Sequence, residues 1–532
     1  MFSEQAGDET HKTEFAYDRD NRVTGSTYDG SSHKVNYTYD ELGRVKIRTV
    51  ECGEDTGKVT NIYTYVPGGY GVNSSTPLVW QIMQEKIGLE YEYDSRGNIT
   101  SEKRGNLTTT YQYDALGQLL RVNDPHENAT WVYNYDRGGN ITSKVKYAYT
   151  TGTVGTALET IPYVYGDSNW KDKLTSYNGQ TITYDAIGNP LNDETWTYTW
   201  QAGRQLKQMS AEGTNVSFKY DHNGMRVQKV VEQSWYPETT NYTYHGKLLT
   251  HMTVDYTDFD EVAHQDEMHF FYDSESHPAK ISYNGIIYTY VHNIQGNIVG
   301  IVDNNGTIVV EYKYDVWGKP LGVTGSLAST LGQKNPFRYR AYIYDEETEL
   351  YYLQNRYYDP GTCRFLNADH VSNLGTNNEL LTYNGYAYCE NDPVNCFDSE
   401  GCWALPNWAK AAIGVVTTVA AVAVTVATGG AALPVIAGVA ASTVSGAIGG
   451  YITGGKEGAI DGAADGLMFG GIGALASSAI GAIKTVRAYK KTVDTYSTLT
   501  KRYKGSGMEA HHIIEKRLAE GVKVEDITNA FR

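Results

Sequence analysis

A seven-residue pattern, Tyr-x-Tyr-Asp-x-x-Gly, recurs between residues 10 and 345 of this 532-residue chain. Clear copies are YTYDELGRVK from Tyr37, YEYDSRGNIT from Tyr91, YQYDALGQLL from Tyr111, YNYDRGGNIT from Tyr133, FKYDHNGMRV from Phe218 and YKYDVWGKPL from Tyr312, and looser copies are ITYDAIGNPL from Ile182 and YVHNIQGNIV from Tyr290. Several neighbouring copies begin 20 to 22 residues apart. A pattern that returns at such a period indicates stacked supersecondary units.

Each copy predicts a strand, a tight turn and a second strand. Residues i and i+2 of a strand point to the same face, so Tyr91 and Tyr93 project together and successive repeats can align their aromatic side chains. Asp94 at the first position of a type I turn can accept hydrogen bonds from the following backbone N–H groups, and Gly97 at the fourth tolerates the exit geometry. One such hairpin cannot bury a face alone, so we expect the copies to pair edge to edge into a continuous sheet.

The composition agrees with a mainly β fold. Tyrosine occurs 45 times and glycine 55 times, a bias that favours strands and tight turns, and we expect only a small α-rich region at the C-terminus. A chain of this length is expected to divide into two or three regions. The net charge is −17; from Cys402 onward there are 13 Lys and Arg against 9 Asp and Glu, so residues 1–401 have a net charge of about −21.

The repeats resemble the YD repeats of the Rhs (rearrangement hot spot) family over roughly residues 10–345. The resemblance implies a β-sheet wound spirally into a hollow shell that encloses a C-terminal polypeptide. It implies four regions: a YD-repeat shell at residues 1–335, a core at 336–401, an apolar pre-toxin region at 402–483 and a toxin at 484–532. Winding would also hide most strand edges.

Residues 336–401 contain the most specific motif of the chain, PFRYRAYIYDEETELYYLQNRYYDPGTCRFLNADHVSN followed by YNGYAYCENDPVNCFDSEG. It resembles the Rhs-associated core, which implies a plug that acts as an aspartyl autoprotease. The family's arginine falls on Arg356 and its two aspartates on Asp369 and Asp398, with the scissile bond between Gly401 and Cys402. Such chemistry needs one protonated and one ionised carboxyl group, a division that proximity and burial can enforce.

The core departs from the family pattern at both aspartates. The family has Asp-Pro at each, whereas His370 follows Asp369 and Ser399 follows Asp398 here. The loss of a proline removes a rigid turn that would present the scissile bond. The alternative reading is that both aspartates only cap turns, as surface carboxylates commonly do.

The composition changes at Cys402, and residues 411–455 contain no charged side chain. The run is long enough for two spans of about 20 residues, each able to cross a bilayer about 30 Å thick, and Gly429, Gly430 and Pro434 interrupt it in the middle. Two readings stay open: a segment that inserts into a target-cell membrane, and an apolar helical pair packed inside the shell.

The C-terminal MEAHHIIEKRL, residues 508–518, resembles the AHH and HNH (His-Me finger) nuclease toxins. The resemblance implies that His511 binds a divalent metal, Mg²⁺ or Zn²⁺, that His512 is the general base, and that Glu515 and Asn529 complete the site together with Glu509. Lys and Arg also crowd residues 484–504, which suits either a phosphate backbone or a solvated helix face. Only twenty residues follow His512 and none is histidine, so we expect the domain to be truncated or degenerate.

The five cysteines fit neither a zinc pattern nor a small disulfide scaffold, and we interpret them as structural thiols: Cys52, Cys363, Cys389, Cys396 and Cys402. The N-terminal sequence MFSEQAGDETHKTEFAYD has neither a basic nor an apolar segment, so we expect no signal peptide within it. We nevertheless expect a secreted or cell-surface location, with an export signal upstream or another machine carrying the chain.

Together these features predict a fragment of a bacterial polymorphic toxin with a monomeric shell. Its expected partners are nucleic acid, a cognate immunity protein and, for the apolar run, a target-cell membrane. A rival prediction is an adhesion protein that binds carbohydrate through exposed tyrosines, and another is a toxin that kills through residues 411–455. The direction of the aromatic side chains distinguishes a shell from an adhesion protein. A shell requires them to point inward and interleave, whereas an adhesion protein requires them to be exposed.

Overall fold

The computed structural model describes residues 2–406 except residues 7–8, 21, 31, 54–56, 69–74, 85–86, 234–235, 375–379 and 403–404. The chain divides into two compact units, residues 1–414 and 415–532, and the fold described below is that of the first. Among the described residues no helix is both long and apolar enough to span a membrane. The residues expected to form the apolar run and the nuclease lie outside the described residues.

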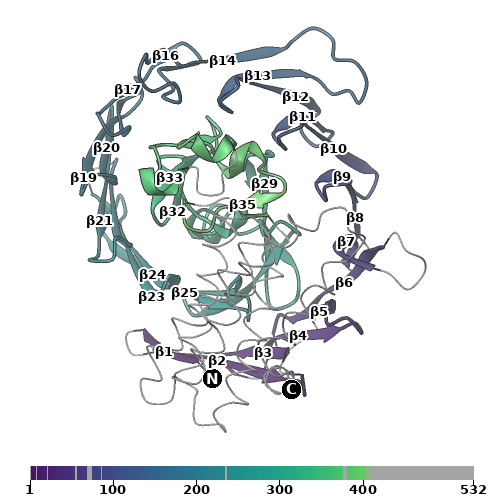
Figure 1. Cartoon of the computed structure of the whole chain (residues 1–532). Helices are drawn as coiled ribbons and strands as arrows, with labels where there is room; N and C mark the ends of the chain where they lie inside the picture. Colours follow the sequence, from purple (N-terminus) through teal and green to yellow (C-terminus); the bar gives the residue numbers. More distant parts are fainter. Residues whose placement is uncertain are drawn as a thin grey trace, which may run out of the picture. The chain divides into compact units, whose positions relative to one another are not determined.

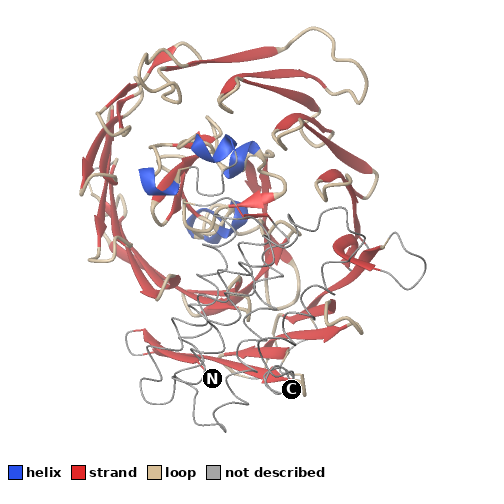
Figure 2. Cartoon of the chain, in the orientation of Figure 1, coloured by secondary structure: helices blue, strands red, loops and turns tan. Residues whose placement is uncertain are grey.

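Two long antiparallel sheets make up most of the first unit, and in each the order of strands follows the order of the chain (Figures 1 and 2). The 16-stranded sheet of the described residues consists of β1 (Phe2–Ala6), β2 (Glu9–Tyr17), β3 (Val23–Tyr28), β4 (His33–Tyr39), β5 (Val45–Glu51), β6 (Lys58–Pro67), β7 (Ser75–Gln84), β8 (Ile87–Tyr93), β9 (Ile99–Arg104), β10 (Leu107–Tyr113), β11 (Leu119–Asp124), β12 (Ala129–Tyr135), β13 (Ile141–Ala148), β14 (Glu159–Val164), β15 (Ser176–Tyr177) and β16 (Gln180–Thr181). The mainly β class and the edge-to-edge pairing of repeats are thereby confirmed.

The 14-stranded sheet follows directly. Its described strands are β17 (Thr183–Tyr184), β18 (Pro190–Asn192), β19 (Thr197–Gln201), β20 (Gln205–Ala211), β21 (Thr214–Tyr220), β22 (Arg226–Glu232), β23 (Glu238–His245), β24 (Leu248–Thr257), β25 (Ala263–Tyr272), β26 (Pro278–Tyr283), β27 (Ile286–His292), β28 (Ile298–Val302), β29 (Ile308–Tyr314) and β30 (Pro320–Thr324). Only one residue separates the last strand of the first sheet from the first strand of the second, so the hairpins follow one another with little interruption.

The repeat motif forms the turn that its sequence predicts. Asp94 Oδ1 accepts the backbone N–H groups of Arg96 (2.8 Å) and Asn98 (2.9 Å), and the Gly97 N–H donates to the Asp94 carbonyl (3.0 Å). Gly97 has φ 87°, a left-handed conformation that glycine adopts at little cost. The same side-chain contacts recur at Asp18, Asp40, Asp114, Asp136, Asp185, Asp221, Asp258, Asp273, Asn293, Asp303 and Asp315.

The two tyrosines of a repeat have different roles. Tyr91 is buried in the core, whereas the hydroxyl of Tyr93 donates to the backbone carbonyl of Val79 on the neighbouring strand (2.7 Å). A bulge directly before Tyr93 shifts the register there. Equivalent hydroxyl-to-carbonyl bonds are made by Tyr39, Tyr65, Tyr113, Tyr135, Tyr165, Tyr184, Tyr220, Tyr272 and Tyr314.

The first strands pack against strands that follow them by more than 200 residues. Tyr28, Val35 and Val50 share a buried cluster with Phe271 and other residues of β25–β28. Lys280 Nζ, in β26, donates to the carbonyl of Glu51 in β5 (2.8 Å). Figure 1 shows the first strands beside β25. The long sheets therefore curve until their beginning overlaps a later part, as a spirally wound shell requires.

Residues 331–406 form a separate group of short elements. They are α1 (Leu331–Lys334), η1 (Tyr339–Ala341), η2 (Val371–Asn373), η3 (Leu380–Tyr383), η4 (Cys389–Asn391), a four-stranded sheet of β31 (Ile343–Asp345), β32 (Leu350–Leu353), β33 (Arg356–Asp359) and β34 (Arg364–Phe365), and a two-stranded pair of β35 (Cys396–Phe397) and β36 (Leu405–Pro406). Figure 1 shows these strands inside the curve of the long sheets.

Aromatic side chains of several repeats pack against this inner group. Tyr91, Tyr111 and Tyr133 share a buried cluster with Tyr351 and Tyr358 of β32 and β33. Inward, interleaved aromatics are the arrangement of a casing. These three tyrosines are buried, so they are not part of an exposed aromatic platform of the kind that the adhesion prediction requires.

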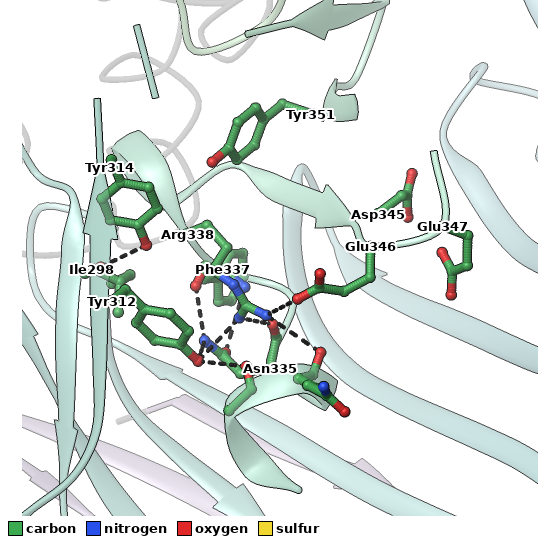
Figure 3. A network of polar contacts seen from close by, with 12 residues as sticks. Ile298, Tyr312, Tyr314, Asn335, Phe337, Arg338, Asp345, Glu346, Glu347 and Tyr351 are labelled. Atoms are coloured by element: carbon green, nitrogen blue, oxygen red, sulfur yellow. Dashed lines mark hydrogen bonds and ion pairs between the residues drawn. The ribbon is translucent and has the colours of Figure 1, made fainter. Parts of the chain in front are cut away.

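A buried arginine joins the last repeat to the inner group (Figure 3). Arg338 Nη1 donates to the Tyr312 hydroxyl (3.0 Å) and to the Asn335 carbonyl, and its Nη2 contacts Glu346 Oε1 (2.9 Å) and the Gln333 carbonyl (3.3 Å). Buried charges are stable only when paired and hydrogen-bonded, so this network fixes the inner group against β29.

Candidate functional site

Three sequence-predicted residues from separate elements meet in the inner group. Arg356 is the first residue of β33, Asp369 follows β34, and Asp398 directly follows β35. Arg356 Nη2 lies 3.0 Å from Asp369 Oδ2 and 4.0 Å from Asp398 Oδ2. All three side chains are less than a tenth exposed. The structure therefore brings the predicted arginine and both aspartates together.

Arg356 also contacts the chain next to the predicted scissile bond. Its Nε donates to the carbonyl oxygen of Gly401, and its Nη1 donates to the carbonyl of Gly385 (2.8 Å). The guanidinium packs over the ring of Phe365, with its carbon 3.5 Å from the ring centroid. One planar cation thus binds two carboxylates and two carbonyl oxygens, which its fixed fork of donors allows.

Asp398 caps the turn that contains the predicted scissile bond. Its Oδ1 accepts the backbone N–H groups of Glu400 (3.2 Å), Gly401 (2.8 Å) and Cys402 (3.1 Å). The Asp398 N–H in turn donates to the Tyr342 hydroxyl (2.8 Å). The expectation that this aspartate caps a turn and the expectation that it lies at the scissile bond are therefore compatible, because the nitrogen of that bond belongs to Cys402.

Asp369 has a different set of donors. Its Oδ1 accepts the backbone N–H of His370 (2.6 Å) and the side-chain amide of Asn373 (2.8 Å), while its own N–H donates to Gly385 (2.8 Å). The family proline at the position of His370 has no N–H to donate. The departure from the family pattern therefore adds a hydrogen bond to this carboxylate.

The backbone at Gly401 requires glycine. Its φ is 74°, and a Cβ there would lie 2.8 Å from the Leu353 carbonyl oxygen and 3.1 Å from the Arg356 nitrogen. A side chain would thus meet both a strained conformation and the backbone of the turn between β32 and β33. The close approach holds the Gly401 carbonyl against Arg356.

The thiol of Cys402 is half-buried beside the same groups. Burial, with a smaller contribution from Asp369, raises the pKa of the Cys402 thiol to about 12. The reactive form of cysteine is the thiolate, so this thiol is poorly suited to act as a nucleophile at neutral pH.

Sequence reasoning missed residues that hold the segment around the predicted scissile bond in place. Asn355 Nδ2 donates to the Glu400 carbonyl (2.9 Å), and Lys247, from the turn between β23 and β24, pairs with the Glu400 side chain (2.6 Å). Tyr342 accepts the Asp398 N–H as described above. Asn355 and Tyr342 lie within the motif that was matched to the family, but nothing in their own spacing distinguishes them from neighbouring residues.

The remaining predicted site residues are not placed by the structure. His511, His512, Glu515 and Asn529 lie outside the described residues. Within the described part of the chain, no group of three or more His, Cys, Asp or Glu side chains is arranged to hold a metal ion.

Comparison with known proteins identifies the fold and its relatives. The family model described as Teneurin YD-shell matches residues 68–394. The tRNA3(Ser)-specific nuclease WapA of Bacillus spizizenii is 32% identical over 421 residues, and the tRNA nuclease WapA of Bacillus subtilis is 33% identical over 421 residues. Each alignment covers 73% of this chain and 16% of the relative, so the chain spans about a sixth of the length of these proteins.

More distant relatives share the same part of the chain. Toxin subunit YenC1 of Yersinia entomophaga is 23% identical over 444 residues, which cover 71% of this chain and 42% of the relative. The crystal structure of TcdB2-TccC3 superposes with a TM-score of 0.56 and 20% identity, covering 74% of this chain and 21% of that chain. With most of its length matched by the shell model and its long sheets wound as that fold requires, the chain belongs to the Teneurin YD-shell family.

Proposed function

We propose that this chain is the shell and core segment of a secreted bacterial polymorphic toxin, and that its core cuts its own chain between Gly401 and Cys402. The observation that carries the proposal is the contact of one guanidinium with both carboxylates and with the Gly401 carbonyl. Relatives among tRNA nucleases and a toxin subunit support the wider role. Cleavage would detach residues 402–532 as the cargo.

The proposed reaction is hydrolysis of one peptide bond. Arg356 polarises the Gly401 carbonyl and stabilises the negative charge that develops on its oxygen. One carboxylate, Asp369, takes a proton from the attacking water as the new C–O bond forms. Asp398 Oδ1 accepts the Cys402 N–H; for this step the Asp398 carboxyl group must carry the proton of the pair, which it passes to the Cys402 nitrogen as the C–N bond breaks. The products are the Gly401 carboxylate and the Cys402 amine.

The charges of the site are compatible with one carboxyl group accepting a proton and the other donating one. Two carboxylates share one arginine, so one negative charge is not neutralised within the trio. Buried like charges resist simultaneous ionisation, and a single shared proton relieves the repulsion. In the proposed reaction one carboxyl group acts as the acid and the other as the base.

Gel mobility and N-terminal sequencing of the full-length chain test the proposal. The wild-type chain is expected to split into two pieces, with the smaller piece beginning at Cys402. Asp398→Asn and Asp369→Asn are expected to stay whole, because each removes a proton-transferring group while keeping the side-chain shape. An uncut wild-type chain would contradict self-cleavage.

We propose further that the cargo is a metal-dependent nuclease. The resemblance of residues 508–518 to His-Me finger nucleases supports this, as do the relatives that are tRNA nucleases. His511 would bind Mg²⁺ or Zn²⁺, His512 would activate the water, and Glu515 and Asn529 would complete the site. Such a toxin would act on nucleic acid in a target cell, and its producer would need an immunity protein.

Degradation of tRNA or plasmid DNA by residues 402–532 tests the cargo proposal. Activity should require added Mg²⁺ or Zn²⁺ and disappear in His512→Ala. Leakage of dye-filled liposomes that is unchanged by His512→Ala would instead favour a cargo that acts on the membrane through residues 411–455.

A further inference from the structure

Asn355 directly precedes Arg356 in the turn between β32 and β33, and it contacts the chain one residue before the Gly401–Cys402 bond. Its side-chain Nδ2 lies 2.9 Å from the Glu400 carbonyl oxygen, and its backbone N–H is shared between the carbonyl oxygens of Leu353 (2.6 Å) and Glu400 (3.2 Å). Two donors of one residue therefore converge on one carbonyl group.

The next residue holds the next carbonyl. Arg356 Nε donates to Gly401, so two consecutive residues of the turn bind two consecutive carbonyl oxygens of the scissile segment. The bond to Glu400 orients the peptide plane between Glu400 and Gly401, and the bond to Gly401 orients the plane of the Gly401–Cys402 peptide. They thereby fix the orientation of the Gly401–Cys402 bond relative to Arg356 and Asp398. A displacement of the reacting atoms by about 1 Å can reduce a reaction rate about 100-fold.

The side chain of Glu400 is held less firmly. Its carboxylate pairs with Lys247 Nζ at 2.6 Å, but these side chains are 36% and 59% exposed. Solvent-exposed pairs of this kind contribute little to the position of a chain. The backbone carbonyl of Glu400 accepts two donors from Asn355; the Asn355 side chain is also exposed, but its backbone N–H belongs to the hairpin itself.

We propose that Asn355 is a positioning residue for self-cleavage: its donors hold the Glu400 carbonyl so that the Gly401–Cys402 bond stays between Arg356 and Asp398. This inference rests on the proposed self-cleavage. Asn355 touches none of the reacting atoms and acts only by orienting the segment that contains them. Two adjacent residues of one hairpin, Asn355 and Arg356, thus bind the backbone of the turn that is proposed to be cut.

The rate of self-cleavage in chains made by cell-free translation tests the inference. A short radioactive pulse labels the full-length chain, and gels then follow the fraction that has split over time. Asn355→Asp keeps the size of the side chain but replaces its N–H donor with a carboxylate oxygen, so we expect cleavage to slow about tenfold or more. Asn355→Gln keeps an amide donor and is expected to restore part of the rate.

Matched controls separate positioning from folding. Asn134, exposed in β12, donates to Ser143 Oγ at 2.9 Å, and Asn134→Asp makes the same chemical change far along the chain. It should leave the rate unchanged. Resistance to limited proteolysis, measured in the uncut Asp398→Asn background, should be equal with and without Asn355→Asp. Should that variant fold poorly, Asn355→Ala removes the donor without adding a charge.

The possible outcomes are distinct. Cleavage of Asn355→Asp or Asn355→Ala at the wild-type rate overturns the positioning role while self-cleavage stands. Equal slowing by Asn355→Gln and Asn355→Asp also overturns it, because the amide donor would then be irrelevant. A wild-type chain that never splits overturns self-cleavage itself, and the positioning role with it.

Discussion

The guanidinium of Arg226 in β22 forms a buried ion pair with Asp345 in β31, with Nη1 2.5 Å and Nη2 3.2 Å from the two carboxylate oxygens. Lys229 Nζ approaches the same carboxylate at 3.3 Å. The rings of Tyr242 and Tyr352 lie within 5 Å of the guanidinium carbon. A charged clamp therefore joins the wall of repeats to the core that contains the proposed self-cleavage site.

Arg226→Ala is expected to destabilise the chain by about 3–5 kcal/mol, because it leaves the Asp345 carboxylate buried without its main partner. The measurement is urea denaturation of the uncut Asp398→Asn chain. The double change Arg226→Met with Asp345→Asn removes both charges and should cost much less. Equal costs for the single and the double change would contradict the clamp.

Loss of the hydroxyl group should change the free energy of unfolding differently at the two tyrosines of one repeat. The Tyr93 hydroxyl donates to Val79, so Tyr93→Phe should cost about 1 kcal/mol. The buried Tyr91 hydroxyl has no hydrogen-bond partner among the described residues, so Tyr91→Phe should be neutral or stabilising. Urea denaturation of both variants checks the difference, and a larger cost for Tyr91→Phe would contradict the assignment.

Most of the fold that could be predicted from the sequence, namely the turns and the pairing of hairpins, was predicted from the repeat motif. The turn at Asp94 and Gly97 follows from local hydrogen bonding, so one sequence suffices to predict it. Four turns were not predicted, those at Asp18, Asp258, Asp273 and Asp303; at Asp258 and Asp273 the glycine position is occupied by Glu261 and Ser276, which adopt φ 61° and 64°. The role of Tyr93 escaped notice as well, because strand alternation says nothing about a bulge.

The site was predictable only where a family motif names its residues. Arg356, Asp369 and Asp398 are more than ten residues apart, and no periodicity brings them together. Tertiary structure alone shows that Asn355 and Tyr342 hold the same segment, since their partners are backbone groups. A contact between a side chain and a backbone group produces no pattern of residue types in the sequence, so the sequence alone does not predict it.

The overlap of the first strands with β25 should weaken in acid. His269 stacks on His11 with 3.8 Å between ring centroids, lies 6.4 Å from the ring of His251, and contacts Phe271; Asp29 pairs with His11 (2.5 Å). Burial, then the neighbouring His11, lowers the pKa of His269 from 6.5 to about 3. At pH values between about 3 and 6.5 the unfolded chain binds more protons than the folded chain. The contribution of His269 to the free energy of unfolding is therefore complete above about pH 6.5 and decreases as the pH falls toward 3.

Near pH 5 the loss from His269 amounts to about 2 kcal/mol. Urea denaturation of the uncut Asp398→Asn chain at pH 7 and pH 5 measures it. His269→Phe keeps a stacked ring without a titrating group and should show a smaller drop. His222→Phe, at an exposed position, should show the full drop. An equal drop in the chain with and without His269→Phe would contradict the assignment.

Gly401→Ala should abolish self-cleavage without unfolding the chain. The new Cβ would lie 2.8 Å from the Leu353 carbonyl oxygen, so the Gly401 carbonyl must move away from Arg356. Gly213 has nearly the same φ, 75° against 74°, but no atom within 4 Å of the position of an added Cβ. Gly213→Ala therefore has the same strain, about 1 kcal/mol, and should split at the wild-type rate. Rapid splitting of Gly401→Ala on the same gels would mean that the close approach to β33 is not needed for cleavage.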